Sequence, residues 1–213
     1  MKKSLVLVGM IVALVSLMMS GQASAGPELE FSTDNGTTWT TITSTGSQNV
    51  EFIGSIGDYS LVVSSGTSSP GYMDLNVSVN SYPNSTTEEL KILLSDPGTA
   101  YTNTSKWSFY GTAAPINATL QLTSYYDTAP FGTSNMIAGF TVPPEPASAK
   151  TSDTISALSP YFLTDQAILT PSTGPVSASF NMQLEIVPEP ATLLLVGGGL
   201  TGLALLRRRV NKA

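Results

Sequence analysis

Apolar and polar residues alternate along several stretches in the middle of the chain. The longest stretches are 73–80 and 176–186, and 118–122 repeats the pattern over a shorter length. A period of two places successive side chains on opposite faces, which indicates half-buried strands. Further short apolar runs lie between turn-rich segments, at 52–53, 61–63, 90–94, 107–110 and 161–163. The pattern predicts about ten strands and contains no convincing amphipathic helix.

Gly, Pro and Ser cluster between these strands. Short strands separated by such turns favour an all-β fold, an antiparallel β-sandwich with a jelly-roll arrangement as one form of it. An open barrel is the alternative. The segment from Thr141 to Asp153 contains Pro143-Pro144-Glu145-Pro146 and lacks clear alternation, so it is predicted to be a long surface loop.

The N-terminus has the three parts of a secretory signal peptide. Lys2-Lys3 precede an apolar stretch from Leu5 to Met19, and Ala23-Ser24-Ala25 follows. Small residues at Ala23 and Ala25 predict cleavage before Gly26. The predicted organisation is therefore a signal peptide at 1–25, one β-sandwich body at 26–186 and a separate C-terminal segment at 187–213.

The C-terminal segment combines Pro188-Glu189-Pro190, an apolar run from Ala191 to Leu206, and Arg207-Arg208-Arg209. Each proline lacks a backbone N–H and favours an extended predecessor, so the tripeptide is expected to be stiff and exposed. A helix through the apolar run would be about 24 Å long, shorter than the ~30 Å hydrocarbon core of a bilayer. The arginines are expected to remain cytoplasmic. An ordinary C-terminal membrane anchor is the alternative.

This combination resembles the PEP-CTERM sorting signal of Gram-negative bacteria. The resemblance implies that Pro188, Glu189 and Pro190 are read by exosortase, a membrane-embedded cysteine transpeptidase. Exosortase would remove the tail of a protein transiently anchored in the inner membrane and deliver the body to the envelope, outer surface or extracellular matrix. The resemblance further implies association with exopolysaccharide and biofilm. Pro144-Glu145-Pro146 repeats the tripeptide, but polar residues follow it, so we expect no sorting there.

The net charge of the body is more negative than that of the whole chain. The chain has nine Lys and Arg and fifteen Asp and Glu, and six of the basic residues lie in the two terminal segments. The body keeps Lys91, Lys106 and Lys150, so its net charge is 3 − 15 = −12 when Glu189 is counted with it. Such a surface repels phosphate backbones, which excludes nucleic acid as a partner.

The chain contains no Cys and no His. Thiol nucleophiles, His general bases, Ser-His-Asp triads and the usual zinc sites are therefore excluded. We expect no enzyme activity, no cofactor and no metal. Two function classes remain: a non-catalytic structural or adhesive protein of the cell surface or matrix, and, as the alternative, an extracellular carbohydrate-binding module. A glycosidase that uses paired carboxylates is a distant third.

One local motif has a recognisable pattern. The segment 32–39 has the spacing Ser-x-Asp-x-Gly-x-Thr-Trp and resembles the Asp-box hairpin of sialidases and other propellers, with matching residues Ser32, Asp34, Gly36, Thr38 and Trp39. We expect a structural hairpin from about Leu29 to Ile42. Asp34 should accept hydrogen bonds from the turn, Gly36 should adopt a positive φ, and Trp39 should cover the hairpin. A buried Trp39 would make Trp39→Ala cost roughly 3 to 5 kcal/mol. A sugar-binding role for the hairpin is the alternative.

Aromatic side chains concentrate at 107–110 and 125–126, and either a sugar-stacking platform or core packing could explain them. Core packing is the more frequent role of aromatic residues in β-sandwiches. The residues concerned are Trp107, Phe109, Tyr110, Tyr125 and Tyr126.

Overall fold

The computed structural model describes residues 26–44, 48–69, 71–82, 88–98, 100–101, 105–155, 160–172 and 174–187. The predicted signal peptide and most of the C-terminal segment, including every residue of its Pro-Glu-Pro and Arg motifs, lie outside these residues. Within the described ranges, no helix is long and apolar enough to cross a membrane.

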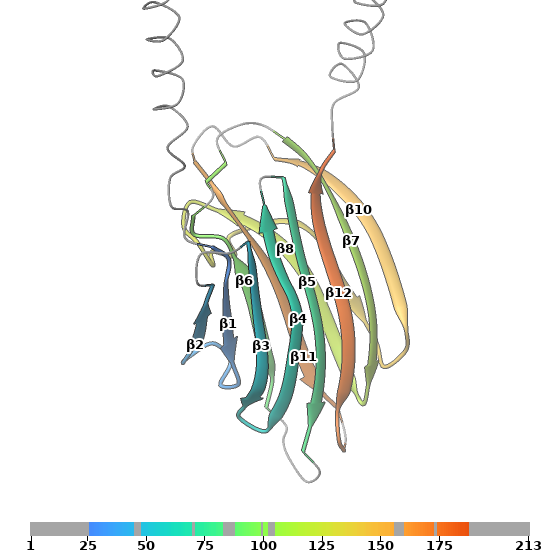
Figure 1. The fold of residues 1–213 in the computed structure, drawn as a ribbon. Coiled ribbons are helices and arrows are strands. Elements are labelled where there is room, and N and C mark those ends of the chain that lie inside the picture. Colours follow the sequence, from blue (N-terminus) through green and yellow to red (C-terminus); the bar gives the residue numbers. More distant parts are fainter. Residues whose placement is uncertain are drawn as a thin grey trace, which may run out of the picture.

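In the described part of the chain, twelve strands form two six-stranded antiparallel sheets, which face each other as a sandwich (Figure 1). Sheet A has the order β2 (Thr40–Thr43), β1 (Glu28–Ser32), β6 (Leu90–Ser95), β11 (Phe162–Pro171), β8 (Ala118–Asp127) and β9 (Asn135–Val142). Sheet B has the order β10 (Ala147–Ile155), β7 (Ser105–Ile116), β12 (Ser177–Ile186), β5 (Tyr72–Ser81), β4 (Tyr59–Ser69) and β3 (Asn49–Ile56). The prediction of an antiparallel β-sandwich is confirmed.

The last eight strands are nested as in a jelly roll. Strand β5 pairs with β12, β6 with β11, β7 with β10 and β8 with β9. When this nested set folds over itself, the eight strands divide between the two sheets. Sheet B then contains the order β5-β12-β7-β10, and sheet A contains the order β6-β11-β8-β9. The hairpin β3–β4 then extends sheet B beyond β5, and the hairpin β1–β2 extends sheet A beyond β6.

The alternating stretches supply the core. In β5 the side chains of Met73, Leu75, Val77 and Val79 are buried between the sheets, and β12 buries Ala178, Phe180, Met182 and Leu184 in the same way. Their polar neighbours in the sequence lie on the opposite, outer face of sheet B. The period-two prediction is therefore correct for both strands.

Strand β10 was missed, because the region from Thr141 to Asp153 was predicted to be one loop. In the structure β9 continues to Val142 and β10 begins at Ala147, so the connection contains only residues 143–146. Strand β10 is an edge strand that pairs only with β7, and most of its side chains are exposed on both faces. An edge strand without a buried face carries no alternating apolar signal.

An aromatic cluster fills one end of the core. The Tyr101 ring meets Trp107 edge to face at 5.3 Å and stacks on Tyr161 at 5.6 Å. Tyr126 contacts Tyr161 at 5.8 Å. Burial raises the pKa of Tyr101 to about 12, because the ionised phenolate would lose its hydration. Tyr101 therefore packs in this cluster as a neutral ring.

A buried carboxyl group interrupts the apolar interior. Asp165 of β11 is fully buried and points between the sheets, where the Ser124 hydroxyl of β8 donates a hydrogen bond to its Oδ1. Within the described residues, its Oδ2 has no hydrogen-bond partner. Burial raises the pKa of Asp165 to about 7, with the Asp74 carboxylate as a smaller cause in the same direction, while the Ser124 hydrogen bond opposes the shift.

Asp165→Asn is predicted to change the pH dependence of stability. The pKa of Asp in an unfolded chain is about 3.9. As the pH rises from about 4 to about 7, the unfolded protein releases this proton while the folded protein keeps it, so the free energy of unfolding falls. The neutral amide removes this cost. The variant should therefore gain stability relative to the parent, by a few kcal/mol, across that interval. Urea unfolding at several pH values measures the difference.

Asp34→Asn is the matched control for this measurement. Hydrogen bonds lower the pKa of Asp34 to about 2, so the parent gains stability from this group above about pH 4 and loses it as the pH falls through 2. This variant should lose stability relative to the parent as the pH rises. If both substitutions gave the same pH slope, the assignment of Asp165 as the buried acid would be wrong.

Candidate functional site

The outer face of sheet B presents rows of polar side chains. Its side chains come from the outward positions of four adjacent strands, and we call it the polar face. In register across β10, β7, β12 and β5, one row reads Lys150, Tyr110, Gln183 and Asp74, the next row reads Ser148, Thr112, Asn181 and Asn76, and the row on the other side reads Ser152, Ser108, Glu185 and Tyr72.

Two hollows lie on the polar face. One, of about 620 Å³, has Asn76, Asn181 and Thr112 among its lining residues. The other, of about 570 Å³, has Lys106 and Lys150 in its lining, with hydroxyl groups of three neighbouring residues. Amide and hydroxyl groups can both donate and accept hydrogen bonds, so the hollows suit a ligand rich in hydroxyl groups.

Tyr110 lies between the two hollows. The outward positions of β7 run Ser108, Tyr110, Thr112; the first lines one hollow and the last lines the other. The Tyr110 side chain is 42% exposed, which is unusual for an aromatic residue in a central strand of a sheet. An exposed ring flanked by amides and hydroxyls can pack against the apolar face of a sugar.

The electrostatics of the polar face are mixed. Burial, followed by the Asp74 and Glu185 carboxylates, raises the pKa of Tyr72, so this residue presents a neutral hydroxyl. Lys106 and Lys150 contribute positive charge near Glu185. Within the described ranges, no group of three or more acidic side chains is arranged to hold a metal ion.

Sequence reasoning missed most of this face. Asn76, Asn181 and Gln183 occupy the polar positions of the alternating stretches. Only the apolar positions were used, to predict the strands and the core. Only the pairing of β5 with β12 and of β12 with β7 brings these amides together.

The aromatic residues divide between the core and the two outer faces. Trp107 and Phe109 are fully buried, and Tyr126 packs on Tyr161, so core packing is confirmed for these three. Tyr110 faces outward from sheet B and Tyr125 occupies an outward position of sheet A. The five aromatic residues therefore do not form one platform.

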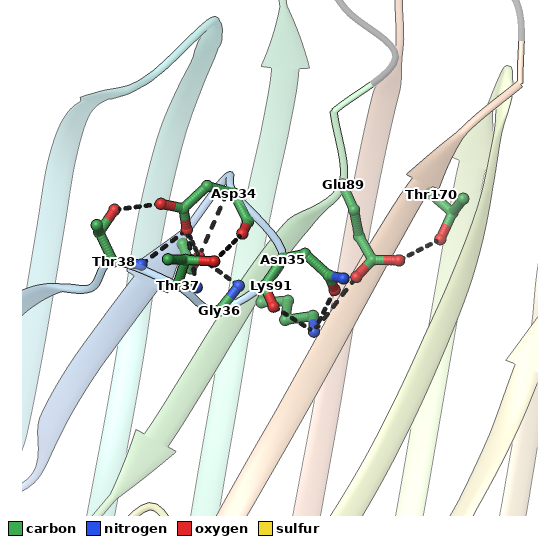
Figure 2. A network of polar contacts seen from close by, with 9 residues as sticks. Asp34, Asn35, Gly36, Thr37, Thr38, Glu89, Lys91 and Thr170 are labelled. Carbon is green, nitrogen blue, oxygen red and sulfur yellow. Dashed lines mark hydrogen bonds and ion pairs between the residues drawn. The ribbon is translucent and has the colours of Figure 1, made fainter.

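The turn between β1 and β2 forms the hydrogen bonds predicted for it (Figure 2). Asp34 Oδ1 accepts hydrogen bonds from the N–H groups of Thr37 at 3.0 Å and Thr38 at 2.9 Å, and the Thr38 hydroxyl donates to Oδ2 at 2.6 Å. The Ser32 hydroxyl donates to Asp34 at 2.7 Å and accepts from the Gly36 N–H at 2.9 Å. Gly36 has a φ of 86°, as expected. The register pairs Leu29 with Ile42, so the predicted hairpin is also confirmed.

A chain of polar contacts ties this turn to sheet A (Figure 2). Lys91 Nζ of β6 donates to Asn35 Oδ1 at 2.8 Å and lies 3.5 Å from Glu89 Oε1. The Thr170 hydroxyl of β11 donates to Glu89 at 3.2 Å. Lys91 thus holds the turn against its neighbouring strand, which favours a structural role for the hairpin.

Trp39 is not buried as predicted. Its side chain is 38% exposed, although an ideal Cβ at Gly36 would lie 3.3 Å from the indole ring. The indole therefore lies over the turn without entering the core. The physical reason is that Trp39 directly precedes β2, an edge strand that has a single neighbour.

Asp58 and Asp74, a carboxylate pair that glycoside hydrolysis could use, are not brought together. Asp58 lies in the turn before β4, whereas Asp74 pairs with Thr67 near the other end of that strand. This separation is about 25 Å along the strand, well beyond the spacing of a glycosidase pair. Glu88 and Glu89 precede β6, and Glu89 is bound by Lys91.

Trp39→Ala is now predicted to cost only about 1 to 2 kcal/mol, because much of the ring is already in contact with water. The matched control is Phe31→Ala in β1 of the same hairpin. Phe31 is 1% exposed, so its truncation should cost roughly 3 to 5 kcal/mol. Equal losses in urea unfolding would show that Trp39 belongs to the core.

Several solved structures are remotely similar to this chain. An N-terminal cellulose-binding domain of Cellulomonas fimi β-1,4-glucanase C is 15% identical, with a TM-score of 0.35, and the match covers 58% of this chain and 93% of that domain. A carbohydrate binding module of Cellvibrio mixtus lichenase 5A is 12% identical, with a TM-score of 0.31 and coverage of 55% and 88%. The K1 cleaved adhesin domain of Lys-gingipain from Porphyromonas gingivalis is 10% identical, with a TM-score of 0.31 and coverage of 67% and 100%.

A comparison with curated proteins gave no match. The predicted sorting residues Pro188, Glu189, Pro190 and 207–209, like the predicted signal-cleavage residues Ala23 and Ala25, lie outside the described residues, while Gly26 is the first residue described. The family model of the PEP-CTERM protein-sorting motif matches residues 187–209. The chain therefore carries a PEP-CTERM protein-sorting motif directly after its last strand, and this motif implies that the protein is exported.

Proposed function

We propose that this protein is cleaved by an exosortase and acts at the cell surface or in the extracellular matrix. Its role there is non-catalytic and adhesive, linked to exopolysaccharide and biofilm. The observation that carries the adhesive role is the polar face, where the exposed Tyr110 lies between one hollow with amide and hydroxyl groups in its lining and another with lysines and hydroxyl groups.

The position of the motif supports the proposed processing. Strand β12 ends at Ile186 and the motif begins at the next residue. Cleavage within the motif would therefore leave every described strand in place. Because no part of the described core comes from the motif, the body can lose the tail and remain folded.

A carbohydrate-binding module is the second candidate. It differs from a general matrix protein in that it would recognise one defined sugar. The exposed ring of Tyr110 favours it, because a single stacking residue with flanking amides fixes the orientation of a sugar ring. Saturable binding to a defined glycan would distinguish this candidate from broad retention in a matrix.

The first test concerns processing. Protein recovered from the envelope or medium should begin near Gly26 and lack residues 191–213, which an intact mass measures. Replacing Arg207, Arg208 and Arg209 with Ser should block maturation, because the positive residues no longer fix the orientation of the short apolar run. The matched control replaces Pro144, Glu145 and Pro146, which form the short connection between β9 and β10, and should mature normally. Mature protein that retains the arginines would contradict the proposal.

The second test concerns the polar face. Tyr110→Ala should weaken retention of the full-length protein by purified exopolysaccharide at least about tenfold, because stacking and its desolvated surface are lost. Tyr125→Ala is the matched control, since that ring lies on the outer face of sheet A. Affinity electrophoresis measures both variants. Equal retention of the parent and both variants would remove the polar face from the proposal.

A further inference from the structure

The hollow of about 570 Å³ on the polar face gathers most of the positive charge of the body. Residues 26–186 contain three lysines and no arginine. Lys106 of β7 and Lys150 of β10 both line this hollow, together with Ser108, Ser152 and Glu185. Two of the three lysines of a strongly acidic body therefore lie in one hollow, where the local charge is positive.

Among the residues that the structure describes, these two lysines have no ion-pair partner. Within the described residues, the one salt bridge joins Lys91 and Glu89, on the other sheet. Glu185 lines the same hollow without forming a salt bridge to either lysine there. The hollow therefore has a net positive charge that the described residues leave uncompensated.

The register fixes how the lysines are arranged. Lys150 lies beside Tyr110, and Lys106, four residues before Tyr110 in β7, lies beside Thr154. The two positions are about 13 Å apart along the strands. Between them, Ser108 lies beside Ser152 and provides hydroxyl groups. Along the strands, the Tyr110 ring and the Lys150 ammonium group come first, the serine hydroxyl groups follow, and the Lys106 ammonium group comes last.

We propose, on the basis of the adhesive function proposed above, that this hollow binds an acidic polysaccharide through its uronate carboxylates. Tyr110 packs against one sugar ring, and the ammonium group of Lys150 binds the carboxylate of that sugar or its neighbour. Lys106 binds a second carboxylate further along the polymer. The serines bind ring hydroxyls between the two charges.

The charge of the whole body makes this site selective. Away from the hollow, the acidic surface repels a polyanion, so the polymer is held only where the two lysines outnumber Glu185. A neutral polymer lacks the carboxylates that the lysines require and gains only the stacking and hydroxyl contacts. The expected preference is therefore for the acidic form of an otherwise identical polymer.

A matched pair of polymers tests the inference. Polygalacturonate and its fully methyl-esterified form share one backbone and differ in the charge of the carboxyl groups. The full-length protein, purified in detergent, should bind the acidic form about tenfold or more tightly in titration calorimetry, since each charge-assisted hydrogen bond contributes about that factor. The variant K106Q/K150Q should lose this preference, with an unchanged melting temperature.

Two control variants sharpen the result. K106R/K150R keeps both charges and should keep the preference. K91Q removes one charge from the other sheet and should also keep it. Equal affinity for the two polymers, binding of neither, or an unchanged preference in K106Q/K150Q would overturn the inference. Exopolysaccharide retention that depends on Tyr110 but not on the lysines would overturn the inference while leaving the proposed function in place.

Discussion

The last strand occupies the middle of a sheet, and the rest of the molecule depends on its pairing. Strand β12 lies between β5 and β7 and buries alternate side chains against sheet A. Sheet B cannot close until the chain has been completed to Ile186, because β5 and β7 have no direct pairing with each other. The sorting motif begins one residue later. The order of the strands therefore places the end of the closed sandwich directly before the sorting motif.

The same pairing creates the polar face. The outward residues of β12 lie beside those of β5 on one side and of β7 on the other, which joins amides from distant parts of the chain. Backbone hydrogen bonding between these strands holds the side chains in fixed rows. Such rigid spacing limits the entropy that a ligand-binding surface loses when it binds an extended polymer. A jelly-roll sheet can therefore present an ordered surface for binding.

The two leading hairpins extend the sandwich beyond its eight-stranded roll, and each adds an edge strand. The hairpin β1–β2 is held to β6 by strand pairing and by the contacts of Lys91 with Asn35 and Glu89. The body has only three lysines, and one of them, Lys91, has a structural role at this turn. The other two lysines, Lys106 and Lys150, both lie on the polar face. The three lysines of the body therefore divide into one with structural contacts and two in a candidate binding site.

The sequence by itself determined the fold class, the alternating strands at 73–80 and 176–186, the turn chemistry of Asp34 and Gly36, and the sorting motif after Val187. Each of these depends on local residues: a period of two, a short hydrogen-bonded turn, or a contiguous peptide. Only the tertiary structure decided that β12 lies between β5 and β7, that Tyr110 is exposed while Trp107 is buried, and that Asp165 enters the core. It also showed an exposed Trp39 and a strand at Ala147–Ile155, most of which lies in the loop predicted from Thr141 to Asp153. These features depend on which strands become neighbours and which become edges, and long-range pairing of this kind leaves no local pattern in the chain.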